Sequence, residues 1–309
     1  MRRALLPLLL ALVALAACAG TAAPPVVPRV TPGCTLTRQA DLSLREVRNF
    51  LLVPARLDGH FVQLLVDTGA ETSTLTPQAA RQLRLPFASN RGAVMLGIAG
   101  PFRSETVRVH EFVVGDVVLA NKRLGLIPMP PFRGEHPAVV GLLGTDLLAG
   151  FEVDLDVPAG RMLLYAAQGC HAIEPWRGGV AVPIAETRSG LMFVDAVVNG
   201  VTVRALLDSG ARTTLIARGT AARLGVTPAM LARDPARVGM GVGRRDIAVR
   251  QHRFASIGLP GAMDHDVIAN VADLRLPGIA MLLGADYLAR RHIWISYATN
   301  RLFVRQDER

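Results

Sequence analysis

Residues 64–74 read LLVDTGAETST, so an apolar run leads directly into Asp67, Thr68 and Gly69. An acid in that position can mark a simple turn at the end of a strand, or it can be a carboxylate delivered to a catalytic cleft. It cannot lie deep in an apolar core unless it is paired or protonated. One Asp-Thr-Gly tripeptide does not separate these readings, because so short a pattern occurs by chance in unrelated chains.

A second copy of the pattern favours the catalytic reading. Residues 205–215 read ALLDSGARTTL, which places Asp208 141 positions after Asp67. Residues 142–148 (LLGTDLL) and 282–288 (LLGADYL) repeat at an offset of 140, as do 160–165 (GRMLLY) and 300–304 (NRLFV). Three matched landmarks at offsets of 140 or 141 indicate an internal duplication.

Each copy of the repeat predicts the same order of secondary-structure elements, most of them β-strands. A strand, a tight turn and a second strand lead to the acid, and the Asn199-Gly200 pair is a strong hairpin signal. A short helix follows the acid, with Thr76 expected as the N-cap of the first. Late in each copy, Asp146 and Asp286 are expected to be N-caps of another short helix, with a structural role.

The N-terminus predicts export. Arg2 and Arg3 precede an apolar stretch over residues 4–17, which is too short to span a bilayer and is typical of a signal peptide. It ends in LAAC, which resembles a bacterial lipobox and implies a lipidated Cys18 on the outer membrane, facing the periplasm. Ordinary cleavage after Ala19, giving a periplasmic or secreted form, is the alternative. Residues 18–46 are then expected to be the lipidated N-terminus and a tether.

Export bears on the other two cysteines, Cys34 and Cys170. An oxidising compartment favours a disulfide between them over two free buried thiols.

The composition excludes several other classes of protein. The net charge of +9 is spread over scattered arginines with a single lysine, Lys122, so nucleic-acid binding is not expected. The sequence has no zinc-protease or Cys-x-x-Cys motif, and Asp264-His265-Asp266 is more typical of a polar surface than of a metal site. No metal or cofactor is predicted.

The paired Asp-Thr/Ser-Gly-Ala and Leu-Leu-Gly-x-Asp segments resemble the retropepsin-like aspartic proteases. That resemblance implies two tandem acid-protease β-barrel lobes, at residues 47–167 and 180–305, joined by a linker at residues 168–179. In one chain the lobes would form an intramolecular pseudo-dimer, so a monomer is expected. The implied activity is hydrolysis of a protein or peptide substrate.

The resemblance also implies roles for residues near the two turns. Asp67 and Asp208 would share one proton and activate a water molecule. Their supporting residues would be Thr68, Gly69, Ala70, Ser209, Gly210 and Ala211. Because Ala70 and Ala211 lack a hydroxyl that could donate to the acids, activity is expected at mildly acidic to near-neutral pH. Two glycine-rich flaps would cover substrate with Leu96, Gly97, Ile98, Ala99, Gly100, Met240, Gly241, Val242 and Gly243.

Two other functions stay open at this point. An actin-like or sugar-kinase ATPase also has an Asp-x-Gly phosphate loop, but the export signal and the matched Leu-Leu-Gly-x-Asp pair argue against it. A non-catalytic peptide-binding lipoprotein could use the same cleft, although both acids and both glycines are present. Glu71 and Arg212 follow the two motifs at equivalent positions and differ in charge. If these two residues line the cleft, they would interact differently with the two ends of a substrate. Otherwise they are solvated residues at the rim.

Overall fold

The computed structural model describes residues 28–97, 100–129, 132, 134–240, 246–274, 276 and 278–306. The predicted signal peptide and Cys18 lie outside these residues, as do Ile98, Ala99, Gly241, Val242 and Gly243 of the predicted flaps. Among the described residues, no helix is long and apolar enough to cross a membrane.

The first copy of the repeat folds into a β lobe, here called lobe 1. Its sheet has the strand order β3-β4-β5-β10-β6-β9-β8-β7, and a pairing between β4 and β8 curls the sheet back on itself. The elements are β3 (Arg45–Val47), β4 (Phe50–Leu57), β5 (His60–Val66), β6 (Thr74–Leu75), α1 (Pro77–Gln82), β7 (Phe87–Gly97), β8 (Gly100–Val114), β9 (Val117–Leu126), β10 (Val139–Leu143) and α2 (Thr145–Leu148).

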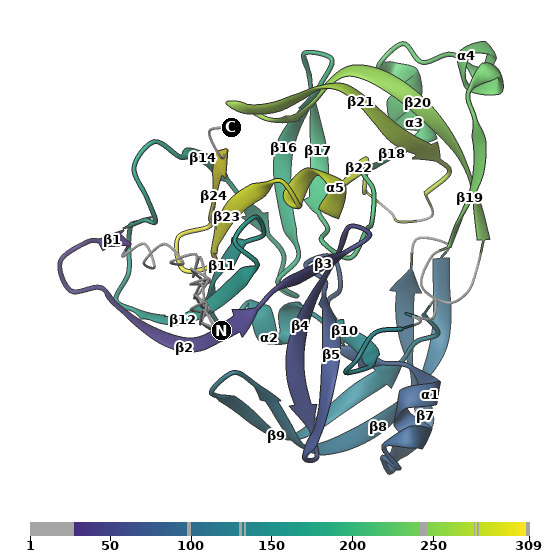
Figure 1. The fold of residues 1–309 in the computed structure, drawn as a ribbon. Helices are drawn as coiled ribbons and strands as arrows, with labels where there is room; N and C mark the ends of the chain where they lie inside the picture. Colours follow the sequence, from purple (N-terminus) through teal and green to yellow (C-terminus); the bar gives the residue numbers. More distant parts are fainter. Residues whose placement is uncertain are drawn as a thin grey trace, which may run out of the picture.

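The second copy forms lobe 2 with the same strand order, β15-β16-β17-β22-β18-β21-β20-β19, and an equivalent pairing between β16 and β20. Its elements are β15 (Ala185–Glu186), β16 (Met192–Val198), β17 (Val201–Leu207), β18 (Leu215–Ala217), α3 (Arg218–Arg223), α4 (Pro228–Arg233), β19 (Ala236–Met240), β20 (Asp246–Leu259), β21 (Ala262–Ala272), β22 (Met281–Leu283) and α5 (Ala285–Leu288). The predicted mainly β fold with two tandem lobes and a few short helices is confirmed, and Figure 1 shows lobe 1 below lobe 2.

A third sheet, here called the shared sheet, joins the two copies. Its order is β14-β24-β23-β11-β12-β2, made of β2 (Thr35–Ser43), β11 (Glu152–Asp156), β12 (Arg161–Gln168), β14 (Val180–Pro183), β23 (Arg291–Ser296) and β24 (Arg301–Gln306). At its centre β11 pairs antiparallel with β23, with Val153 opposite Ile295. It lies to the left of both lobes in Figure 1. A separate two-stranded sheet pairs β1 (Arg29–Val30) with β13 (Ile173–Glu174).

The shared sheet includes part of the segment expected to be a tether. Residues 35–43 pair with β12 over its whole length, and Ala40 and Leu42 are buried in the main core. The C-terminal part of the region expected to be a tether is therefore a structural strand. The expected linker also contains structure, since Ile173 lies in β13 and Trp176 is buried.

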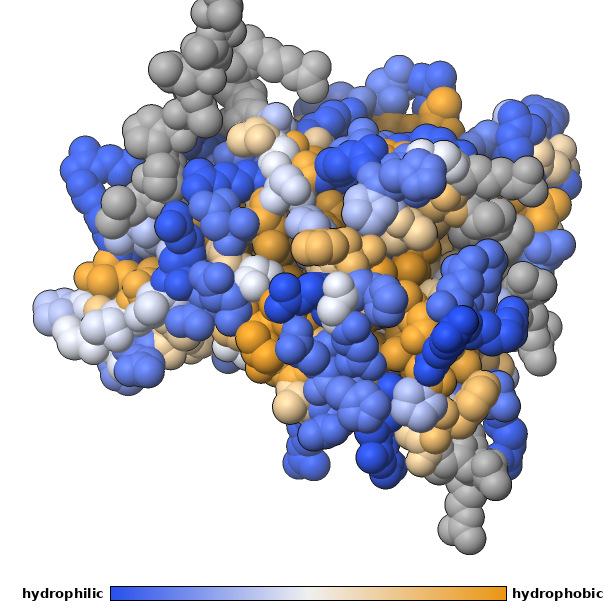
Figure 2. Space-filling view, turned by 60° about the horizontal axis from the view of Figure 1, so that its bottom comes forward, coloured by the Kyte–Doolittle hydropathy of each residue, from blue (hydrophilic) through white to orange (hydrophobic). Residues whose placement is uncertain are grey.

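One hydrophobic core runs through both lobes. It contains Leu51 and Val53 of lobe 1, Val194 and Ala196 of lobe 2, and Ile295 of the shared sheet. Val194 and Ala196 alternate along β16 with more exposed residues, the period-two pattern of a sheet with one buried face, whereas β23, which contains Ile295, is buried along its whole length. Figure 2, which brings the lobe 1 side forward, shows hydrophilic side chains over most of the surface with apolar ones in gaps between them. The two lobes are therefore packed as one unit.

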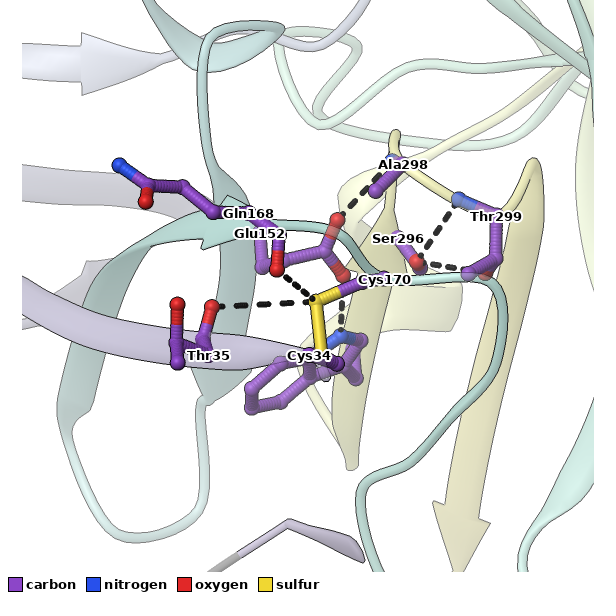
Figure 3. Close-up of a disulfide and its surroundings, with 9 residues drawn as sticks. Cys34, Thr35, Glu152, Gln168, Cys170, Ser296, Ala298 and Thr299 are labelled. Carbon is purple, nitrogen blue, oxygen red and sulfur yellow. Dashed lines mark hydrogen bonds between the residues drawn. A yellow bond between two sulfur atoms is a disulfide. The ribbon is translucent and has the colours of Figure 1, made fainter. Parts of the chain in front are cut away.

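A disulfide fixes the start of the shared sheet. Cys34 and Cys170 are joined with their Cα atoms 4.4 Å apart, next to a cluster that includes Tyr165, Trp176 and Trp294. Beside the disulfide, the carboxylate of Glu152 accepts hydrogen bonds from Trp294 Nε1 at 2.9 Å and from the Ala298 amide at 3.0 Å (Figure 3). The Cys34–Cys170 disulfide thus connects the chain before β2 to the segment between the lobes.

Removing this disulfide is expected to destabilise the protein substantially. The two cysteines are 136 positions apart, and a cross-link that closes a long loop lowers the entropy of the unfolded chain. The variant with both Cys34→Ser and Cys170→Ser should lose about 2–5 kcal/mol of unfolding free energy in urea titrations. A reducing agent should lower the stability of the parent to that of the variant and leave the variant unchanged. Equal stability of both proteins under oxidising conditions would contradict this expectation.

Candidate active site

The two Asp-Thr/Ser-Gly turns begin where a central strand of each lobe ends. Asp67 follows β5, which pairs in parallel with β10, and its amide donates to the Leu143 carbonyl at 2.9 Å. Asp208 follows β17, which pairs in parallel with β22, and its amide donates to the Leu283 carbonyl at 3.0 Å. The Leu-Leu-Gly segments of the repeat are therefore the strands that anchor the turns.

Four hydrogen bonds cross-link the turns. The Thr68 amide donates to Ser209 Oγ at 3.0 Å, and the Ser209 amide donates to Thr68 Oγ1 at 3.0 Å. Each hydroxyl also donates across the junction: Thr68 Oγ1 to the Leu207 carbonyl at 2.8 Å, and Ser209 Oγ to the Val66 carbonyl at 2.7 Å. Both side chains are fully buried, so the network fixes the relative position of the two turns.

The glycine after each hydroxyl residue lies against the acid of the other lobe. A Cβ added at Gly69 would lie 2.5 Å from Asp208 Cγ, and one at Gly210 would lie 2.3 Å from Asp67 Cγ. Real Cβ atoms do not approach other atoms so closely. Glycine is therefore required at both positions for the acids to meet.

The two acids meet at this junction, because each carboxyl lies against the glycine of the other turn. The Gly69 amide donates to Asp67 Oδ1 at 3.0 Å and the Ala211 amide to Asp208 Oδ1 at 2.9 Å. This arrangement brings the two predicted acids together from residues far apart in sequence.

Burial dominates the electrostatics of the pair. Asp67 is only 7% exposed, and loss of hydration together with repulsion from Asp208 raises its pKa well above the usual value. Loss of hydration also raises the pKa of Asp208 to about 6, opposed by the Ala211 and Gly210 amides. Ala70 and Ala211 pack against apolar clusters of their lobes, which keeps the surroundings of the acids apolar. Such a pair holds one proton near neutral pH and titrates as a unit.

These pKa shifts predict a pH dependence of stability. A carboxyl whose pKa is higher in the folded than in the unfolded state stabilises the fold below the unfolded pKa, and that contribution is lost as the pH rises through the folded value. For Asp208 this contribution is lost as the pH rises from 3.8 to about 6. The shift corresponds to roughly 3 kcal/mol of unfolding free energy. Between pH 4 and 7 the parent should therefore lose at least this much unfolding free energy relative to the variant with Asp67→Asn and Asp208→Asn. Parallel curves for the two proteins would contradict the raised pKa values.

The predicted N-cap role of Asp146 and Asp286 is wrong. Gly144 and Gly284 occupy the N-cap positions of α2 and α5, and each acid lies in the first turn of its helix. Asp146 instead accepts hydrogen bonds from the Ser73 amide at 2.8 Å and Ser73 Oγ at 2.6 Å.

The equivalent contacts of Asp286 come from Thr214, whose amide lies 2.9 Å and whose Oγ1 lies 2.8 Å from Asp286 Oδ1. Ser73 and Thr214 in turn accept from the Gly144 and Gly284 amides. Both acids therefore brace the segments after the turns. Sequence analysis missed Ser73 and Thr214, although the repeat placed both six residues after an acid.

Each lobe has a hairpin at the position of a predicted flap. In lobe 1, β7 and β8 pair up to Gly97 opposite Gly100, with Leu96 opposite Pro101. In lobe 2, β19 and β20 pair up to Met240 opposite Asp246. The strands of both predicted flaps are thus antiparallel hairpin arms, whereas contact with substrate stays a prediction.

The Asp264-His265-Asp266 segment has ordinary ion pairs. Asp264 binds Arg290 and Arg291, each at 2.7 Å, and Asp266 pairs with Arg253. Within the part of the chain that the structure describes, no cluster of His, Cys, Asp and Glu could hold a metal ion.

Two comparisons bear on the identity of the chain. Residues 53–147 match the aspartyl protease family, and residues 194–290 match the gag-polyprotein aspartyl protease family. A search of curated proteins gave no significant match. The matched segments contain both Asp-Thr/Ser-Gly turns, the strands that anchor them and both flap hairpins. The chain is therefore a member of the retropepsin-like aspartic protease family, with two protease lobes in tandem.

Proposed function

We propose that the protein is an aspartic endopeptidase that hydrolyses peptide bonds with Asp67 and Asp208 as its catalytic dyad. The observation that supports this most strongly is the close approach of the two turns at the lobe junction, where buried Asp67 lies against Gly210 and half-buried Asp208 lies against Gly69. Two such groups with raised pKa values can keep one proton between them at the pH at which peptides are cleaved.

The chemistry follows from the shared proton. The ionised carboxylate takes a proton from a water molecule, and the oxygen of that water attacks the carbonyl carbon of the scissile bond. The protonated carboxyl donates to the carbonyl oxygen, which becomes a hydroxyl in the tetrahedral intermediate. As that intermediate collapses and the C–N bond breaks, the carboxyl that took the proton from water gives it to the leaving amine, and the other carboxylate takes back the hydroxyl proton as the C=O bond re-forms. Because the proton is shared, acid and base roles are properties of the pair.

The surroundings suit this mechanism. The hydroxyl network of Thr68 and Ser209 holds the turns rigidly, so little reorganisation is needed when charge moves in the reaction. The two hairpins would close over a bound peptide and exclude water from the site.

The test is digestion of a mixed peptide library by the purified chain at pH 3–8, with products identified by mass spectrometry. We expect endoproteolytic cuts, with an acidic limb near pH 6, where Asp208 titrates. Activity that is highest at pH 3 would contradict the raised pKa values of the dyad. Retention of peptides without cleavage at any pH would support a non-catalytic binding protein instead.

We also propose that the enzyme is tethered in the bacterial envelope by a lipid on Cys18, which is supported by the LAAC segment at residues 15–18. Acyl chains on the mature N-terminus would hold the protein at a membrane surface. In fractionated cells, the parent should be found with the membranes and the Cys18→Ala variant in a soluble fraction. The same distribution for both proteins would exclude the anchor.

A further inference from the structure

Glu71 and Arg212 occupy equivalent places on either side of the dyad. Each lies four positions after its acid, and both side chains are exposed. The residue before each is held in the same way: the Ala70 carbonyl accepts from the Thr145 amide at 2.9 Å, and the Ala211 carbonyl accepts from the Ala285 amide at 2.8 Å. The backbone at Glu71 and Arg212 is thus fixed by matching contacts.

Both residues also lie at the boundary between the lobes. Ser189, in the turn between β15 and β16, donates from Oγ to Glu71 Oε1 at 2.8 Å, and its carbonyl accepts from Thr145 Oγ1 at 2.7 Å. Asn49, in the equivalent turn between β3 and β4, donates from Nδ2 to the Arg212 carbonyl at 3.2 Å. Each lobe therefore contacts the residue that follows the other lobe's turn, and the two contacts are related by the repeat.

The charges at these two places do not match. The contacting turns carry the same charges, because Arg48 and Arg188 are equivalent, as are Glu46 and Glu186 in the sequence. Glu71 and Arg212 are opposite in sign. Among the described residues, neither side chain forms an ion pair, so both charges are available to a ligand. One side of the dyad is therefore more acidic than the other.

We propose that Glu71 and Arg212 orient the substrate, so that the enzyme prefers peptides with a basic side chain on one side of the scissile bond and an acidic one on the other. This inference rests on the proposed function. A site built from two equivalent lobes would otherwise accept a peptide in either direction. Opposite charges at its two ends favour one direction and disfavour the other through attraction and repulsion.

The test compares peptides that differ only in the two charged residues beside the cut. All have the same apolar residues around the cut; two carry Lys on one side and Glu on the other, in either order, and two carry Lys on both sides or Glu on both sides. The parent should prefer both mixed-charge peptides over both like-charge peptides by about threefold to tenfold in kcat/KM at low salt, because exposed charge pairs contribute modestly at each end. High salt should reduce the preference.

Charge-swapped variants give the decisive comparison. Glu71→Arg should prefer the peptide with Glu on both sides, and Arg212→Glu should prefer the peptide with Lys on both sides, since both ends of the site then carry the same charge. The variant with Glu71→Arg and Arg212→Glu should again prefer the mixed-charge peptides. Arg305→Glu, an exposed change on β24 of the shared sheet, is the matched control and should retain the preference of the parent. The peptides are compared as ratios within each protein, so a general loss of activity cancels.

Equal cleavage of mixed-charge and like-charge peptides by the parent, or an unchanged preference in either single variant, would overturn the inference and leave the proposed protease activity standing. Failure of the parent to cut a neutral peptide with the same apolar residues would overturn both the inference and the proposed function.

Discussion

Replacing either Asp67 or Asp208 with Asn is expected to lower kcat by about a thousandfold or more. An amide can neither take a proton from water nor exchange one with the remaining carboxyl, so the general acid–base contribution is lost. Because the two acids act as one unit, the double variant should be no slower than the slower single variant.

The measurement is single-peptide kinetics on the parent, both single variants and the double variant. Asn has nearly the shape of Asp and removes an ionisable group from a buried site, so the variants should fold and be no less stable than the parent near pH 7. Thermal unfolding of each variant checks this. A single variant that keeps more than about a tenth of the activity would show that its acid is not in the dyad.

The second large effect is expected from Gly69→Ala and Gly210→Ala. The added methyl would lie 2.5 Å from Asp208 Cγ or 2.3 Å from Asp67 Cγ, so the carboxyls must move apart. A displacement of about 1 Å at a catalytic group can reduce the rate about a hundredfold. Overpacking should also cost about 1–3 kcal/mol of stability.

Gly219→Ala is the matched control for these variants. Gly219 lies in α3, and a Cβ there would have no neighbour within 4 Å. Replacing glycine by alanine in a helix is neutral or stabilising by up to about 1 kcal/mol. Kinetics and thermal unfolding should therefore separate the close approach at the dyad from a general effect of alanine. Full activity of Gly69→Ala and Gly210→Ala would contradict the observed approach of the turns.

The parts of the fold that could be predicted from the sequence are those encoded by the repeated segments. The repeat of Asp-Thr/Ser-Gly and Leu-Leu-Gly-x-Asp predicts two like lobes, because each segment carries its own local signal for strand, turn and helix. Thr76 is the N-cap of α1, as predicted, and accepts from the Ala79 amide at 3.1 Å.

The parts that do not follow from the sequence depend on contacts between distant residues. Nothing in residues 35–43 shows that they pair with residues 161–168 in the shared sheet, because a pairing partner leaves no local pattern. The wrong N-cap assignment of Asp146 has the same cause, since its partner Ser73 is 73 positions away. The contact of Asn49 with the Arg212 carbonyl is likewise invisible until the lobes are placed together.

The most direct test of a dyad shared between the lobes of one chain uses the two single variants together. The parent should cut a reporter peptide, whereas Asp67→Asn, Asp208→Asn and their equimolar mixture, unfolded and refolded together, should all be inactive. Each molecule in that mixture has only one of the two acids, and the lobes are packed within a single chain. Recovery of activity in the mixture would contradict the account, because it would mean that the dyad assembles between two chains.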